Sequence, residues 1–128
     1  MRTFLIATFA AALTLLSAIA PAAEIPFNPT QFAAARAAGK PVAVVFHADW
    51  YPTCRAQAPV LSHLAQSPEF KSVTLYIADF DTEKALKRSL GVTQQSTIVV
   101  FKDGKEIARS TGATQQESLA SLLRQAVS

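Results

Sequence analysis

The chain has 128 residues and a formal net charge of +3, with 50% hydrophobic and 16% charged residues. This length and balance predict one folded domain plus a targeting segment and argue against a multidomain chain. The basic residues are scattered and form no patch interleaved with aromatic residues, so we predict no nucleic-acid binding. The single cysteine, Cys54, excludes a disulfide within the chain, whereas a disulfide to another molecule stays open.

The first 22 residues have the pattern of a secretory signal peptide. Arg2 makes a short positive start, residues 4–20 are almost wholly apolar, and Ala20-Pro21-Ala22 supplies the small residues of a cleavage site. A membrane span is the less favoured alternative, because an apolar run of about 17 residues is short for crossing ~30 Å of hydrocarbon. We therefore predict a signal peptide over 1–22, a domain over 23–128, a periplasmic location, and no membrane association after cleavage.

The first half of the domain has the pattern of a helix, a buried strand and a second helix. Asn28 is a good capping residue for a helix that should end at Gly39, where a positive φ is tolerated. Residues 42–46 are all apolar, as expected for a central strand covered on both faces. The helix expected over 52–66 contains Pro59 in its interior.

The second half should contain a strand, a helix, a hairpin and a last helix. We expect the strands over residues 73–78, 97–102 and 105–110. Asp103-Gly104 is a strong signal for a tight turn between the last two. Asp81 should cap the helix that ends at Gly91, and Thr114 with Glu117 has the spacing of a capping box for the last helix. This order predicts an α/β domain with a mixed central sheet and helices on both faces.

The candidate site is the stretch 46–55, where an apolar strand ends in a polar corner and a helix opens with a proline. The chain's only cysteine lies about one turn into that helix. This stretch resembles the active-site segment of the thioredoxin family, which has the pattern F-x-A-x-W-C-x-x-C-K/R. The matching residues are Phe46, Ala48, Trp50, Cys54 and Arg55. Tyr51 stands where the family's nucleophilic cysteine belongs.

The resemblance covers about residues 25–126 and implies a thioredoxin-like fold. In that family the first cysteine attacks a substrate disulfide and the second resolves the mixed disulfide. A free phenol has a pKa of about 10 and stays protonated, and oxygen forms no disulfide. We therefore expect dithiol activity to be lost, with Tyr51 at the nucleophile position and Cys54 as the only candidate catalytic thiol.

Three further positions depart from the family pattern. The family's buried carboxylate would fall at Val45, the lysine often paired with it at Ile77, and its cis-proline at Ser96. A cis bond before a residue other than proline costs about 2.5–4 kcal/mol, so we expect the Gln95–Ser96 bond to be trans, or cis under strain. We expect the Ser96 hydroxyl to project towards Cys54.

The resemblance also implies a surface for extended peptides beside the helix tip. The residues expected to form it are Trp50, Pro52, Thr53, Gln95, Ser96 and Thr97. For Trp50 two interpretations stay open, an exposed aromatic contact and a side chain packed over the sheet edge. We expect no cofactor and no metal, because Cys54 and His63 are nine residues apart and should face opposite sides of their helix.

Two functions follow from these residues. The first is a secreted thioredoxin-like protein that acts on protein thiols or disulfides with whatever weak chemistry Cys54 performs alone. The second is a redox-inactive module that keeps the groove around Trp50 to bind extended peptides or a protein partner. For Cys54 itself an inert buried thiol, a slow monothiol and a Cys54–Cys54 bridge between two copies all stay open.

Overall fold

The computed structural model describes residues 10–13 and 24–128, so the predicted signal peptide lies outside the described residues except for 10–13. The elements in chain order are β1 (Glu24–Pro26), α1 (Pro29–Ala37), β2 (Val42–His47), α2 (Pro52–Ala65), the 3-10 turn η1 (Pro68–Phe70), β3 (Thr74–Asp79), α3 (Lys84–Leu90), β4 (Thr97–Lys102), β5 (Lys105–Thr111) and α4 (Gln116–Val127). None of the helices in the described part of the chain combines the length and the hydropathy needed to cross a bilayer.

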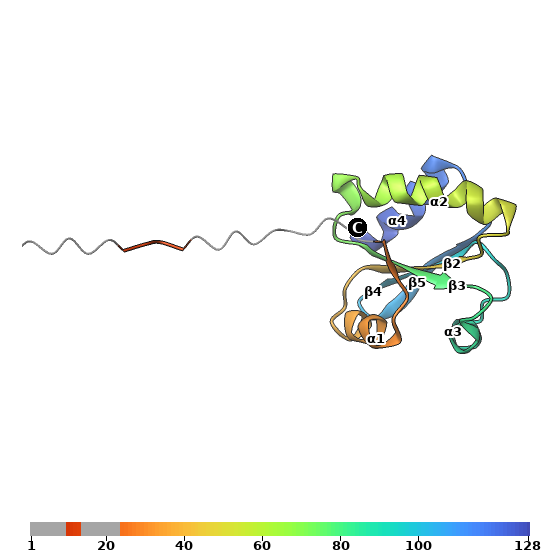
Figure 1. Cartoon of the computed structure of the whole chain (residues 1–128), viewed down its shortest axis with the longest axis horizontal. Coiled ribbons are helices and arrows are strands. Elements are labelled where there is room, and N and C mark those ends of the chain that lie inside the picture. Colours follow the sequence, from red (N-terminus) through yellow and green to blue (C-terminus); the bar gives the residue numbers. More distant parts are fainter. Residues whose placement is uncertain (1–9, 14–23) are drawn as a thin grey trace, which may run out of the picture.

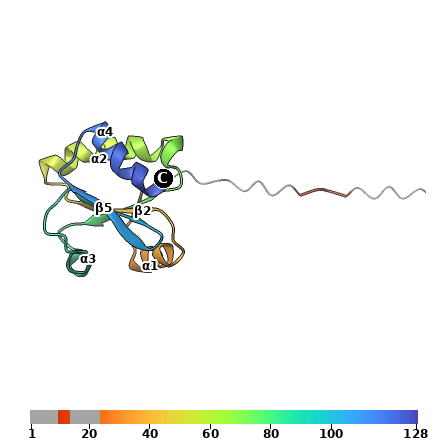
Figure 2. The same cartoon turned by 180° about the vertical axis from the view of Figure 1, so that it is seen from behind.

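The five strands form one mixed sheet in the order β1-β3-β2-β4-β5. Strand β3 pairs in parallel with β1 and β2, and β4 pairs antiparallel with β2 and β5. Helices α2 and α4 cover one face of this sheet, and α1 and α3 lie on the other (Figure 1). The view from behind shows the same layers (Figure 2). This arrangement confirms the predicted mixed sheet with helices on both faces.

The apolar run of β2 is buried on both sides because it is the central strand. Successive side chains of a strand point to opposite faces. Val45 therefore packs in the layer under α2 and α4, while Val44 and Phe46 pack in the layer towards α1 and α3. Removing a side chain of this size from water contributes about 1.5–3 kcal/mol. A strand with polar residues at alternate positions could not occupy this place.

Several of the predicted turn and cap signals are confirmed. The Asn28 side chain accepts a hydrogen bond from the Gln31 N–H at 2.9 Å, which caps α1. Gly91 ends α3 in the left-handed region, with φ of 65°. Asp103 and Gly104 also have positive φ values, 53° and 79°, and join β4 to β5 in a tight antiparallel hairpin.

Two predicted caps are wrong. Helix α3 begins at Lys84, three residues after Asp81, and its N-cap is Glu83. A local turn explains the difference, since the Asp79 carboxylate at the end of β3 accepts hydrogen bonds from the Asp81 and Thr82 N–H groups before the helix begins. Helix α4 likewise begins after Gln115, whose side chain makes no capping bond, so the Thr114 capping box does not form.

Candidate functional site

The candidate site lies where two neighbouring parallel strands end at the same edge of the sheet. His47 of β2 pairs in register with Asp79 of β3, and the Phe80 N–H donates to the His47 carbonyl at 2.9 Å. From His47 the chain turns directly into α2, with Tyr51 as N-cap and Pro52 as first residue. Proline suits this position because its missing N–H would have no partner there. The helix tip therefore stands at the carboxyl end of β2.

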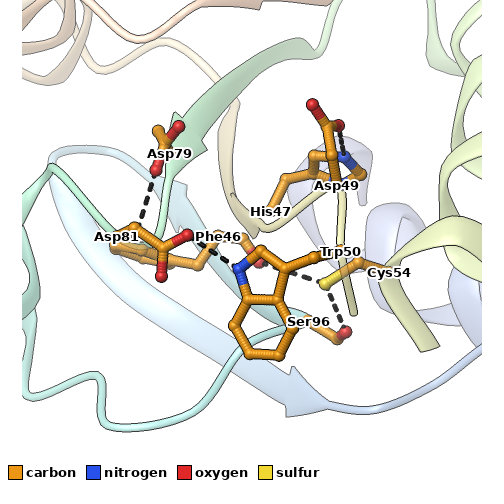
Figure 3. Close-up of polar contacts among 8 residues, drawn as sticks. All are labelled: Phe46, His47, Asp49, Trp50, Cys54, Asp79, Asp81 and Ser96. Carbon is orange, nitrogen blue, oxygen red and sulfur yellow. Dashed lines mark hydrogen bonds and ion pairs between the residues drawn. The ribbon is translucent and has the colours of Figure 1, made fainter. Parts of the chain in front are cut away.

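The only cysteine of the chain is fully buried beneath this tip. Cys54 lies in the first turn of α2 with 0% of its surface exposed. Its Sγ is 2.7 Å from the Ser96 Oγ, and its S–H makes a long contact of 3.9 Å to the Phe46 carbonyl (Figure 3). The Ser96 hydroxyl thus points at the sulfur, as the sequence predicts. We call Cys54, Ser96 and the nearby Gln57 the buried sulfur site.

Ser96 has a backbone conformation that is unusual for a residue with a side chain. The described residues contain no cis peptide bond, so the Gln95–Ser96 bond is trans, and the φ of Ser96 is 60°. The left-handed region costs an L-residue about 1–2 kcal/mol. Ser96 is held there by its N–H bond to the Phe46 carbonyl at 2.9 Å and by the Gly112 N–H, which donates to its carbonyl at 3.0 Å. A strained backbone conformation persists only when the surrounding contacts hold it in place, as these two hydrogen bonds do.

Gln57 is a part of this site that the sequence reasoning missed. Its side chain is only 1% exposed, and its Nε2 donates to the carbonyls of Ser96 at 3.3 Å and Ala113 at 2.9 Å. It therefore ties α2 to the loops before β4 and after β5. Helical spacing could have revealed it, because a residue three positions after Cys54 and four before Leu61 shares their inward face.

The residues at the very tip of α2 face outward, in contrast to the inward-facing residues of the buried sulfur site. Trp50 is 58% exposed, and its indole Nε1–H donates to the Asp81 carboxylate at 2.8 Å (Figure 3). The Tyr51 ring lies against it, with centroids 5.6 Å apart and planes at 72°. We call Trp50 and Tyr51 the aromatic tip. Of the two interpretations for Trp50, the exposed aromatic contact is the one that the structure supports.

The remaining residues of the expected peptide surface are divided between surface and interior. Pro52 is exposed, and Thr53 and Gln95 are half-buried. Ser96 and Thr97 are buried, and the Thr97 hydroxyl donates to the Gln94 carbonyl at 2.8 Å. Of the predicted loop residues, only Gln95 therefore reaches the surface beside the aromatic tip.

The histidine and cysteine side chains near the tip have separate surroundings. His47 Nε2 lies 2.7 Å from Asp49 Oδ1, and Cys54 is buried while His63 is exposed. Within residues 10–13 and 24–128 no group of three or more His, Cys, Asp or Glu side chains is placed to hold a metal ion.

Elsewhere in the molecule, a hydrogen bond from Arg109 lowers the pKa of Glu106.

Known proteins match this chain over most of the domain. Residues 24–125 match the family model described as Thioredoxin. The chain belongs to the thioredoxin family. Thioredoxin from Chlamydia muridarum is 38% identical to it over 82 residues, which cover 64% of this chain and 78% of that protein. Thioredoxin Asp f 29 from Aspergillus fumigatus is 37% identical over 67 residues, 52% of this chain and 61% of that relative, so that match spans about three fifths of the relative's length.

Solved structures agree with the family assignment. The crystal structure of Trxlp from Edwardsiella tarda has a TM-score of 0.76 and 35% identity, covering 79% of this chain and 98% of that one. Thioredoxin Mala s 13 from Malassezia sympodialis, at 23% identity and a TM-score of 0.74, supports the fold alone. The predicted thioredoxin-like fold is therefore confirmed, and the chain is related to proteins that act on thiols and disulfides of other proteins.

Against this thioredoxin pattern, the strand positions beneath α2 carry no titratable group. Val45 and Ile77 are register partners across β2 and β3, and both pack in the apolar layer under α2 and α4. The resemblance implies a carboxylate and a lysine at these two places, where they assist proton transfer to the second sulfur. Two adjacent hydrocarbon side chains cannot perform that role. Both members of the family's carboxylate–lysine pair are thus replaced by hydrocarbon side chains on neighbouring strands.

Proposed function

We propose that this protein is an exported thioredoxin-family protein that binds extended protein segments at the aromatic tip without dithiol exchange. The observation that carries the proposal is the contrast between the fully buried Cys54 and the Trp50 side chain, which is 58% exposed. The surface beside the family's reaction centre is accessible, and the remaining sulfur is not.

The geometry around Cys54 argues against catalysis by this residue alone. Thiol–disulfide exchange needs a thiolate that reaches a substrate sulfur. Cys54 is enclosed by the Phe46 carbonyl and the Ser96 hydroxyl. Tyr51 occupies the helix tip where the family has its attacking cysteine, so the chain has no second thiol to resolve a mixed disulfide formed at Cys54. Burial of the thiol therefore favours the binding module over a monothiol enzyme.

The aromatic tip has the properties of a contact surface. Trp50 is already fixed by its hydrogen bond to Asp81, so it loses little side-chain freedom when a partner covers it. Trp and Tyr are the residues that most often dominate binding energy at protein interfaces. Beside them, the backbone N–H and C=O of Gln95 form no hydrogen bond among the described residues. An extended segment paired with these groups would lie across the tip as an added strand.

The reactivity of Cys54 tests the redox half of the proposal. In the folded protein, a small disulfide reagent should react with Cys54 at least ~10²-fold more slowly than after unfolding, since reaction requires local opening. Insulin reduction should stay near background, and Cys54→Ser is the control that identifies the reacting group. Rapid labelling of the folded protein, together with partner adducts that vanish in Cys54→Ser, would restore the monothiol function.

Peptide binding tests the other half. The probe is a library of immobilised octapeptides, screened with the fluorescently labelled mature protein. Trp50→Ala should weaken the binding of these peptides by roughly 2 kcal/mol, or about 30-fold in affinity. The matched control is Ile107→Ala, since Ile107 is another large hydrophobic residue with 40% exposure but lies on β5. Equal losses in the two variants, or any loss in Cys54→Ser, would contradict binding at the tip.

Export is the third part of the proposal and rests on the sequence of the first 22 residues. Cleavage after Ala22 or Ala23 would release the domain into the periplasm. N-terminal sequencing of the protein recovered from a periplasmic extract should begin at residue 23 or 24. A cytoplasmic product that retains Met1 would contradict export.

A further inference from the structure

We propose that the segment bound at the aromatic tip presents an arginine or lysine side chain to the Trp50 ring. This inference rests on the proposed function and names the chemistry of its partner. It is carried by two observations, the carboxylates at the ends of β2 and β3 and the hydrogen bond that joins one of them to the indole.

The end of the sheet beside Trp50 is acidic in a chain that is basic overall. Asp49 follows the end of β2, Asp79 ends β3, and Asp81 lies two residues further on, while the whole chain carries +3. Because β2 and β3 end in register, these carboxylates gather at one edge. Figure 3 shows them around the Trp50 corner, with the Asp81 carboxylate against the indole nitrogen.

These carboxylates are also available to an external cation. Among the described residues, none of the three aspartates forms an ion pair with a lysine or arginine, and Asp49 contacts only His47. Three glutamates elsewhere pair with arginine, namely Glu69, Glu106 and Glu117, whereas Glu24, Glu83 and Asp103 form no such pair among the described residues. What distinguishes the tip is that three carboxylates without a lysine or arginine partner lie at one edge of the sheet, beside an exposed aromatic ring.

The Trp50 ring is a suitable surface for a cation because of how it is held. A carboxylate that accepts the indole N–H raises the electron density of the ring, which strengthens its attraction for a positive charge over its face. Tyr51 contacts the ring edge-to-face, and more than half of the Trp50 side chain still faces solvent. A guanidinium or ammonium group can therefore stack on the indole while it faces the Asp81 charge.

The same loop already shows such a contact within the chain. Lys87 Nζ lies 3.8 Å from the centroid of the Phe80 ring, and Phe80 sits between Asp79 and Asp81 in sequence. The Lys87 ammonium group makes a cation–π contact with this ring and forms no ion pair with the aspartates. The Trp50 position repeats the combination of an aromatic ring and a nearby carboxylate, but no cation of the described residues lies over its ring.

The experiment compares matched peptides on the mature protein. A library octapeptide that binds is resynthesised with Arg, Gln or Glu at each position in turn, and its affinity is measured by fluorescence anisotropy. At one position, Arg should bind about five- to tenfold more tightly than Gln, and Glu more weakly than Gln. The Arg preference should shrink when the salt concentration rises from about 0.05 M to about 0.5 M, because exposed charges are screened.

A pair of isosteric variants assigns the preference to the tip. Asp81→Asn keeps an oxygen that accepts the indole N–H but removes the charge, so the ratio of Arg to Gln affinities should fall to about twofold. Asp103→Asn is the matched control, since Asp103 is an exposed aspartate at the distant β4–β5 turn, and it should leave the ratio unchanged.

The outcomes separate this inference from the proposed function. Peptides that bind and depend on Trp50 but show no preference for Arg overturn the inference and leave the binding function standing. A preference that survives in Asp81→Asn, or falls equally in Asp103→Asn, also overturns it. Failure of every peptide to bind contradicts the binding function, and the inference falls with it.

Discussion

Cys54 and Gln57 of the buried sulfur site lie within eight residues of the aromatic tip in sequence, yet their surroundings are opposite. Cys54 and Gln57 point inward, where Ser96 and backbone carbonyls satisfy them. Trp50 points outward and is fixed by a single hydrogen bond to Asp81. Cys54 is fully buried although a tyrosine stands at position 51, so its packing does not depend on a thiol at the helix tip. The burial of Cys54 and the exposure of Trp50 are therefore separate features of the fold.

The largest effect expected is a gain of function in Tyr51→Cys. This change places a thiol at the N-terminus of α2, where the helix dipole stabilises a thiolate, three residues before Cys54. Insulin reduction should rise at least about tenfold above background, because an accessible thiolate can attack and Cys54 can then resolve the mixed disulfide. The control is Tyr51→Ser, which removes the same ring. Equal rates in the two variants would show that the buried sulfur site cannot act as a resolving group.

A smaller effect, on stability, is expected when the Gln57 side-chain hydrogen bonds of the buried sulfur site are removed. Gln57→Leu leaves the Ala113 carbonyl without the amide that now donates to it, at a cost of about 1–3 kcal/mol in the free energy of unfolding. Urea denaturation measures this as a lower midpoint. Gln125→Leu is the control, since Gln125 is an exposed glutamine on α4, and its stability should change by no more than about 0.5 kcal/mol.

The smallest expected effect is at Ser96, where the difference in stability between the glycine and alanine variants should have the opposite sign to that in a helix. At Ser121, an exposed position inside α4, glycine should be less stable than alanine by about 1 kcal/mol. At Ser96 the φ of 60° penalises any residue with a Cβ, so Ser96→Gly should be more stable than Ser96→Ala by about 1 kcal/mol. Thermal or urea unfolding of the four variants gives both differences. The same sign at both positions would mean that the loop relaxes out of the left-handed region.

Much of the fold could be predicted from local patterns. The apolar run of β2, the Asp103-Gly104 turn and the Gly91 stop each depend on a few consecutive residues, and each is confirmed. The cap predicted at Asp81 is wrong because Asp79 holds Asp81 in a local turn and the Asp81 carboxylate accepts the Trp50 indole N–H instead. The capping box predicted at Thr114 is wrong because α4 begins one residue later, after Gln115.

The sequence by itself determined the order of elements, the family to which the motif around Trp50 and Cys54 points, and the absence of a second cysteine. The family resemblance also predicted that Ser96, 42 residues away, faces Cys54. Only the tertiary structure decided that Cys54 is fully buried and that the Trp50 indole is hydrogen-bonded to Asp81, 31 residues away. Local preference acts between neighbours in the chain. Burial and long-range hydrogen bonds depend on which segments the sheet brings together, and no short motif contains that information.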